Sequence, residues 1–207
     1  MESIIISDHN RPSDPAPRKR GRRRSDEGPA LDRGRLVEGL LRIVERDGLA
    51  AINMRRVAAE LGVSPRLLYH HVRDKEELID VLLDEILSRH LHDLSHLGWE
   101  QRLRRTCEIS WSAFGRYPGT AAAMLARTAN PVLSPHQSAA RNRFLSALAE
   151  GGLTAEQAES MHLRLLTLIL GGLVLCESVP AARARIEKSV ELGLQSLFEE
   201  VRRWSGG

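Results

Sequence analysis

Residues 53–72 read NMRRVAAELGVSPRLLYHHV, a stretch with the signals of two short helices joined by a tight turn. Its first half repeats apolar residues at helical spacing, namely Met54, Val57, Ala58 and Leu61. Asn53 precedes this face and can accept a hydrogen bond from a free N–H group of the first turn. Gly62 follows it, where a helix often ends in a left-handed residue that glycine adopts at little cost. The pattern predicts a first helix between these two residues.

The second half of the stretch has its own start signals. Ser64 is a typical helix cap, and Pro65 occupies the first helical position, where no N–H group is needed. Val63 and Leu68 have the spacing of a hydrophobic staple, an apolar contact across the start of a helix. Together the two halves predict a helix-turn-helix.

The outward side of the second helix suggests a use for this motif. Leu68 and Val72 lie four residues apart and are expected to face inward, which leaves an outer face of Arg66, Leu67, Tyr69, His70 and His71. In a major groove, Arg can bind guanine and apolar groups can contact the thymine methyl group. We therefore expect DNA recognition; the alternative is a helical hairpin in a larger core, with a merely solvated polar face.

Charge is distributed unevenly along the 207 residues, although the formal net charge is only +3. Residues 1–75 carry 16 Lys+Arg and 11 Asp+Glu, whereas residues 76–207 carry 14 and 16. The positive excess thus lies in the half with the helix-turn-helix, as binding to phosphates requires. The two cysteines, Cys107 and Cys176, form neither a metal-ligand spacing nor a disulfide framework, which indicates a reducing cytoplasm.

Residues 1–30 are rich in Pro, Ser, Asp and Arg and lack periodicity, so we expect them to be disordered. They contain RKRGRRR at residues 18–24. This run predicts a basic arm that follows the phosphate backbone or enters the minor groove; the alternative is a solubilising tail. No signal peptide is expected, because no basic residue precedes the one apolar run near the start.

The rest of the chain is predicted to be helical, which makes the fold all-α with about nine helices. The apolar repeats and caps indicate helices at about 32–47, 74–90, 98–117, 119–127, 134–151, 154–176 and 180–204. Capping boxes are expected at Asp74 with Glu77, Ser134 with Gln137, and Thr154 with Gln157. We divide the chain into a basic arm at 1–30, a helix-turn-helix domain at 31–76, and a helical effector-binding and dimerisation domain at 77–207.

The helices near 154–176 and 180–204 are more apolar than one subunit requires. Residues 163–176 fall short of the roughly 20 residues of a membrane span and include Arg164, so we expect a buried helix and no membrane contact. A second copy of the chain could cover these helices in a four-helix interface with twofold symmetry, and Gly171 and Gly172 would permit close approach. The alternative is a central helix buried within one subunit.

The N-terminal pattern resembles the TetR family of bacterial transcriptional regulators. The resemblance is carried by GLAAINMRRVAAELGVS at 48–64, LYHHV at 68–72 and KEEL at 75–78, and it covers residues 32–86. Trp99 and the Pro118–Gly119 pair resemble the ligand-binding half of tetracycline-repressor-type members more loosely. The resemblance to the family implies an all-helical homodimer that occupies a palindromic operator on double-stranded DNA. It also implies that the dimer leaves this operator when a small-molecule effector enters the C-terminal domain.

The resemblance also assigns roles to residues. It implies that Arg55 reads a base edge, that Lys75 contacts a phosphate, and that the recognition helix presents Ser64, Pro65, Arg66, Leu67, Tyr69, His70 and His71. In the tetracycline repressors a histidine after the fifth helix helps to hold a metal–drug complex. Residues 120–125 read TAAAML and offer no such ligand, so no metal, cofactor or tetracycline–magnesium inducer is expected here.

An effector pocket is expected among the helices of the C-terminal half. Trp111, Phe114, Met124, Phe144 and Leu166 could line it, while Arg127, Asn142 and His162 could orient a polar group. The alternative is that the aromatic residues and the methionine are ordinary core. We interpret His90, His92 and His96 as a solvated helix end, because no carboxylate or cysteine completes a metal site.

The sequence therefore predicts a DNA-binding regulator, a ligand-released repressor rather than an enzyme, in the cytoplasm with the nucleoid. No catalytic grouping of residues occurs in a suitable setting. The alternatives are a nucleoid-type protein with weak sequence preference, an activator, or an enzyme or carrier that uses the helical half alone.

Overall fold

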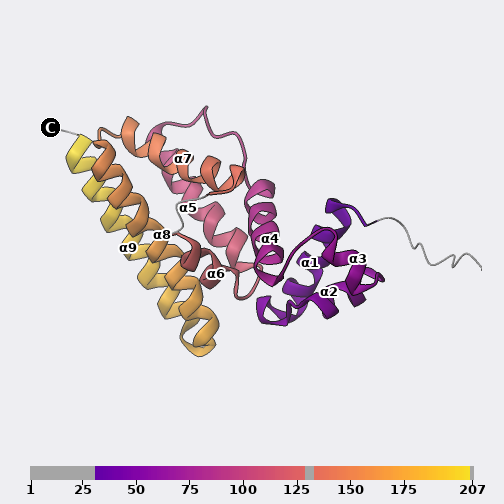
Figure 1. Ribbon diagram of the computed structural model, residues 1–207. Coiled ribbons are helices and arrows are strands. Elements are labelled where there is room, and N and C mark those ends of the chain that lie inside the picture. The colour runs from indigo at the N-terminus through magenta and orange to yellow at the C-terminus, as the bar shows by residue number, and fades with distance from the viewer. Residues whose placement is uncertain (1–30, 129–132, 206–207) are drawn as a thin grey trace, which may run out of the picture. The chain divides into compact units, whose positions relative to one another are not determined.

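The computed structural model describes residues 31–128 and 133–205, and within these ranges the regular structure is entirely helical. The elements are α1 (Arg33–Asp47), η1 (Leu49–Ala51), α2 (Met54–Leu61), α3 (Pro65–Tyr69), α4 (Lys75–Arg89), α5 (Trp99–Gly115), α6 (Thr120–Arg127), α7 (Pro135–Glu150), α8 (Ala155–Ser178), η2 (Pro180–Ala182) and α9 (Arg183–Ser205) (Figure 1). The prediction of an all-α fold is confirmed. The predicted arm at 18–24 lies outside the described residues.

The helix-turn-helix begins and ends where the caps predict. The Asn53 side chain accepts a hydrogen bond from Arg56 N at 2.9 Å, and Ser64 Oγ accepts one from Leu67 N at 3.2 Å. Gly62 ends α2 in the left-handed region with φ = 66°. Because the start, turn and end signals all lie within about 20 residues, the local sequence sets the bounds of this motif, while packing of its apolar face against α1 and α4 stabilises it.

One predicted cap is wrong in detail. The capping boxes that open α7 and α8 are present, but α4 has only half of one. Asp74 accepts a hydrogen bond from Glu77 N at 2.9 Å, yet the Glu77 carboxylate bonds to the backbone and guanidinium nitrogens of Arg73, at 2.6 and 3.0 Å. The reason is charge: a carboxylate forms a stronger bond with a guanidinium group than with a neutral N–H group alone.

A continuous apolar core joins the helix-turn-helix to the C-terminal helices. Buried residues of α1 to α4 pack in one cluster with residues from α5, α6, α8 and the turn between α5 and α6, which include Phe114, Tyr117, Ala121, Leu170 and Leu173. The described residues form one compact unit from Leu31 onward. The domain boundary at residue 76 stays a prediction, since the core runs across it.

A second core lies among α5, α7, α8 and α9, so α8 is a central helix. Its members include Leu103, Phe144, Met161, Leu165, Ile169 and Phe198. With 24 residues, α8 is longer than the apolar stretch at 163–176 and is long and apolar enough to cross a membrane, although 44% of its most apolar window is buried. The length of α8 is therefore sufficient for a membrane span. Its apolar composition is also explained by its packing against four other helices.

Helices α8 and α9 lie side by side along one flank of the bundle (Figure 1). A Cβ atom on Gly172 would lie 2.5 Å from Val190 Cγ2, and one on Gly193 would lie 2.8 Å from a Leu168 methyl group. Gly171, in contrast, faces open space. Of the two glycines expected to permit close helix approach, Gly172 does so within the subunit, whereas Gly171 lies on the uncovered side.

The corner between α5 and α6 contacts η1 of the N-terminal half. Leu49 N donates a hydrogen bond to Pro118 O at 2.8 Å, and Gly119 N donates one to the Glu177 carboxylate of α8 at 3.0 Å. Gly119 has φ = 86°, and a Cβ atom there would lie 2.9 Å from Leu49 Cβ. Glycine is thus required for both backbone conformation and space.

Candidate DNA-binding surface and ligand cavity

Helix α3 exposes the residues that the sequence assigns to DNA. Leu68 and Val72 are buried beneath it, as expected. The outward residues are exposed, Tyr69 by 55% and Leu67 by 36%, together with Ser64, Pro65, Arg66, His70 and His71. Helix α3 ends at Tyr69, so the two histidines lie in the turn that follows it rather than on the helix itself.

Some basic residues on and near α3 form ion pairs with acidic residues, and others do not. Among the described residues, Arg55, Arg66 and Lys75 have no ion pair or hydrogen-bonding partner for their side chains. Arg56 pairs with Asp47, and Arg73 pairs with Glu77 at 3.0 Å. Three exposed cations with no counter-ion therefore surround the short helix, which suits contacts to phosphates and base edges.

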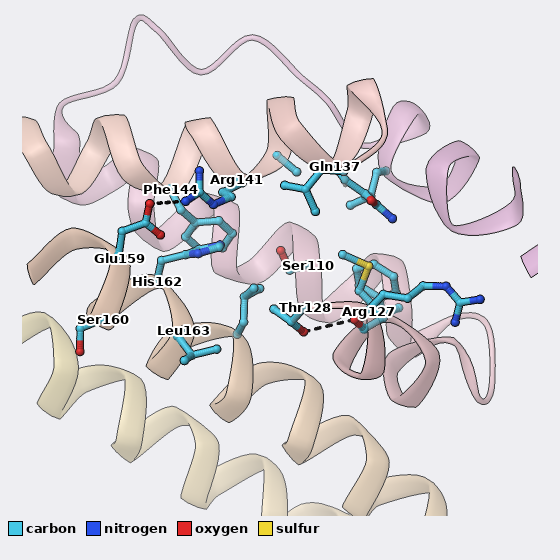
Figure 2. Close-up of a pocket in the computed structure, with 16 residues that line it drawn as sticks. Ser110, Arg127, Thr128, Gln137, Arg141, Phe144, Glu159, Ser160, His162 and Leu163 are labelled. Atoms are coloured by element: carbon cyan, nitrogen blue, oxygen red, sulfur yellow. Dashed lines mark hydrogen bonds and ion pairs between the residues drawn. The ribbon is translucent and has the colours of Figure 1, made fainter. Parts of the chain in front are cut away.

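A cavity of about 790 Å³ lies among the helices of the C-terminal half (Figure 2). Its volume falls in the range of small-molecule sites. Residues from α4, α5, α6, α7, α8 and the segment before α7 line it, namely Leu87, Ser110, Phe114, Met124, Arg127, Thr128, Leu133, Gln137, Ala140, Arg141, Phe144, Glu159, Ser160, His162, Leu163 and Leu166.

The structure brings six of the eight expected pocket residues to this cavity: Phe114, Met124, Arg127, Phe144, His162 and Leu166. Trp111 lies instead at a second hollow between α5, α8 and α9, beside Gly172. Asn142 is exposed and lines neither space. Residues 137, 140, 141 and 144 of α7 face the cavity at helical spacing, and position 142 points away from that face.

Sequence reasoning missed several polar residues of the cavity wall, among them Gln137, Arg141 and Glu159. Arg141 of α7 pairs with Glu159 of α8 across 18 positions of sequence (Figure 2). No local signal identifies such a pair, because it depends on how two helices pack. The capping box does mark Gln137, but as a cap rather than as part of a wall.

Arg127 connects the cavity to α4. It lines the cavity, while its Nε donates to Asp80 at 2.6 Å and its Nη2 donates to Glu76 at 2.7 Å. Although burial opposes it, the two carboxylates raise the pKa of Arg127 overall. The guanidinium group is thus already compensated by two carboxylates of the helix that leads from the helix-turn-helix.

His162 is a polar residue of the cavity wall that is almost fully buried. It is only 7% exposed, and within the described part of the chain it has no hydrogen-bonding partner. Its ring lies 5.1 Å from that of Phe144, centroid to centroid, at 50° (Figure 2). Burial, with a smaller effect of nearby Arg141, lowers the pKa of His162 to about 4. The imidazole is therefore neutral near pH 7 and offers one donor and one acceptor.

A polar contact around Asp84 joins α4 to α7 and α1. Asp84 is buried and accepts hydrogen bonds from Ser134 Oγ and, at 2.8 Å, from His136 Nδ1, while Arg33 Nη2 approaches to 3.5 Å. Burial raises the pKa of Asp84, but the bonds from Ser134 and His136 outweigh this and lower it overall. Gln137 closes the capping box on Ser134 and also lines the cavity, so the cavity wall and this contact share a helical turn.

The described residues contain no group of three or more His, Cys, Asp or Glu side chains placed to hold a metal ion. His90, one of the three clustered histidines, has its Nδ1 2.7 Å from Ile86 O. Cys107 is buried, and burial raises the pKa of its thiol to about 12, so the thiolate nucleophile is scarce at neutral pH.

The described residues thus combine an exposed helix-turn-helix with a helical bundle that holds a ligand-sized cavity. A family model described as "Bacterial regulatory proteins, tetR family" matches residues 36–82. Residues 36–82 are therefore a TetR-type N-terminal domain, as the resemblance in the sequence predicts.

The chain is also similar to individual proteins, both in sequence and in fold. The HTH-type transcriptional repressor DrrR1 of Streptomyces coeruleorubidus is 32% identical over 128 residues, which are 61% of this chain and 46% of that protein. The chain thus covers less than half the length of the curated relatives that it matches. Two solved structures share the fold. BioQ with its natural double-stranded DNA operator has TM-score 0.71 and 24% identity, covering 83% of this chain and 98% of that one. A TetR variant from Acinetobacter baumannii AYE in complex with minocycline has TM-score 0.72 and 19% identity, with 84% and 98% covered.

Proposed function

We propose that the protein is a sequence-specific DNA-binding transcriptional regulator, acting as a repressor that a small molecule releases from its operator. The observation that carries this proposal is the set of unpaired cations, Arg55, Arg66 and Lys75, around the exposed face of α3. Tyr69 and Leu67 add apolar surface to that face, as contact with base edges requires. Ser64, Pro65, His70 and His71 complete the proposed contact surface.

The comparisons support the same function. DrrR1 is named a transcriptional repressor, and BioQ and the A. baumannii TetR variant were solved with an operator and with minocycline, respectively. In this chain we assign the effector to the cavity beside Phe114, Phe144 and His162. No catalytic role or cofactor is proposed. The protein is proposed to act in the cytoplasm, associated with the nucleoid, and the basic residues of 18–24 are proposed to add affinity for DNA.

The protein is proposed to act as a homodimer through α8 and α9. Leu163 and Leu175 on α8 are each 53% exposed, and Leu192 on α9 is 54% exposed. On α8 the two leucines share a side with Gly171, which leaves room for a close neighbour. Two recognition helices held at a fixed separation would read the two halves of a palindrome.

The effector signal is proposed to pass from the cavity to α4. Phe114 lines the cavity and belongs to the core that α1 to α4 share, while Arg127 bonds from the cavity wall to two α4 carboxylates. A ligand that fits one arrangement of these groups better than the other shifts the balance between them. Helix α4 then carries the change to the helix-turn-helix.

Selection from random DNA tests the proposed DNA function. The purified protein is incubated with a pool of random duplexes, the bound fraction is amplified over several rounds, and binding is measured at several salt concentrations. We expect an inverted repeat whose affinity exceeds that of random DNA by about a thousandfold or more. Equal affinity for all duplexes, with a steep salt dependence, would instead show a nucleoid-type protein and refute the proposal.

A charge in the proposed dimer face tests the homodimer. Leu175→Glu is expected to weaken self-association by about a hundredfold, since two carboxylates would lose water near a twofold axis. Analytical ultracentrifugation over a concentration series measures this, and circular dichroism checks the fold. Asn142→Glu, on the exposed side of α7, is the matched control and should leave association unchanged. An equally stable dimer in both variants would contradict this interface.

A further inference from the structure

The charged groups on the cavity wall are already compensated. Arg127 bonds to Asp80 and Glu76, and Arg141 pairs with Glu159. These are the arginine and carboxylate side chains that line the cavity, so the wall offers a ligand no unpaired counter-ion among the described residues. A charged ligand would have to displace one of these pairs or lose its water without compensation, and both are costly.

The imidazole of His162 remains available for a hydrogen bond. His162 is more than nine-tenths buried, lines the cavity and has no hydrogen-bonding partner within the described residues. A ligand that covers this ring displaces water from its nitrogens, so a ligand group that bonds to the ring binds more favourably than an apolar group. Burial keeps the pKa of this imidazole near 4, so near pH 7 it presents a neutral ring rather than a cation.

The surroundings of His162 are aromatic and apolar. The Phe144 ring lies beside it (Figure 2), and Phe114, Met124 and Leu166 line other parts of the same space. Phenyl rings contact flat ring systems favourably in offset or edge-to-face arrangements, and Met adapts to irregular shapes. The wall thus combines an aromatic and apolar surface with a neutral hydrogen-bonding ring.

We propose, building on the effector role assigned to this cavity, that its ligand is an uncharged, mainly apolar molecule with a flat ring system, held through one hydroxyl or carbonyl group by His162. A hydroxyl can donate to the unprotonated ring nitrogen, and a carbonyl can accept from the N–H group. The paired ions of the wall select against carboxylates and amines.

A matched series of fluorescent probes tests the ligand class. The full-length protein is titrated at pH 7 with pyrene, 1-pyrenemethanol, pyrene-1-carboxylate and 1-pyrenemethylamine, which share one ring system and differ in polar group and charge. We expect the alcohol to bind at least about tenfold more tightly than either charged probe and than pyrene itself, since it alone makes the bond without carrying a charge.

Substitution of His162 tests the contact. His162→Phe keeps an aromatic ring and should remove the preference for the alcohol over pyrene, while pyrene itself still binds and shows that the cavity is intact. His162→Gln keeps a donor and an acceptor and should retain part of the preference. Asn142→Ala changes an exposed residue on the same helix as Phe144 and should leave all four affinities unaltered.

Three results would overturn the inference: a charged probe that binds as tightly as the alcohol, no binding of any pyrene, or an unchanged preference in His162→Phe. The selection from random DNA is independent of these titrations. A protein that selects a palindrome but prefers a carboxylate refutes the ligand class alone. A protein without sequence preference refutes the proposed regulator whatever the probes show.

Discussion

Arg66→Ala is expected to weaken binding to the selected operator by about a hundredfold or more. A good bidentate contact between arginine and guanine is worth about 1–3 kcal/mol, and a dimer would lose one in each half-site. Because each 1.4 kcal/mol is about tenfold in affinity, losing about 1.4 kcal/mol in each half-site, towards the low end of that range, gives about a hundredfold. The side chain is exposed and has no described partner, so the free energy of unfolding should not change.

The measurement is a fluorescence-anisotropy titration of labelled operator, repeated with single base changes. Arg185→Ala is the control, because that side chain on α9 is likewise exposed and without a described partner. Lys75→Ala should act differently: as a phosphate contact in each subunit, it should weaken binding to all sequences alike and reduce the slope of log affinity against log salt concentration by about 2. Wild-type affinity and base preference in Arg66→Ala would mean that α3 does not read DNA through this residue.

Asp84→Asn is expected to lower the free energy of unfolding by about 1–3 kcal/mol, because it weakens charge-assisted hydrogen bonds to a buried group. Ser134 and His136 donate to this carboxylate, and Arg33 lies 3.5 Å away. Asp80→Asn, one turn earlier on α4, removes an ion pair whose carboxylate side is 60% exposed and should cost no more than about 0.5 kcal/mol. Urea denaturation at pH 7 compares the two variants.

The pH dependence of this difference has a defined direction. The pKa of Asp84 is lowered in the folded protein, so its ionised form contributes stability above the unfolded pKa of about 3.9. That contribution is lost as the pH falls through the folded pKa, and the gap between wild type and Asp84→Asn should close in acid. Equal destabilisation by both substitutions at pH 7 would show that burial gives Asp84 no special role.

The sequence predicts the helix-turn-helix in detail because its determinants are local. Asn53, Gly62 and Ser64 each act on backbone within four residues, and the structure confirms each cap. The half-formed box at Asp74 marks the limit of this reasoning, since the neighbouring Arg73 competes for Glu77. The roles of Arg55, Arg66 and Lys75 on DNA stay predictions.

The cavity is less predictable because it depends on contacts between distant segments. Trp111 and Phe114 lie on one helix at neighbouring positions of its surface, yet Trp111 packs towards Gly172 and Phe114 faces the cavity. A helix covered on two sides does not reveal from its sequence which side encloses a space. Asp84 meets Ser134 and His136 across 50 and 52 residues, and no spacing rule identifies such partners.

The contact between Leu49 and Pro118 has a mechanical consequence when it is combined with the one at Asp84. Both sets of hydrogen bonds join the N-terminal helices to the bundle, in addition to the shared apolar core and the ion pairs of Arg127. A subunit held together in this way moves largely as one body. In the proposed dimer, a small change in how the two subunits pack along α8 and α9 would therefore alter the distance between the two recognition helices, and with it the operator spacing that they fit.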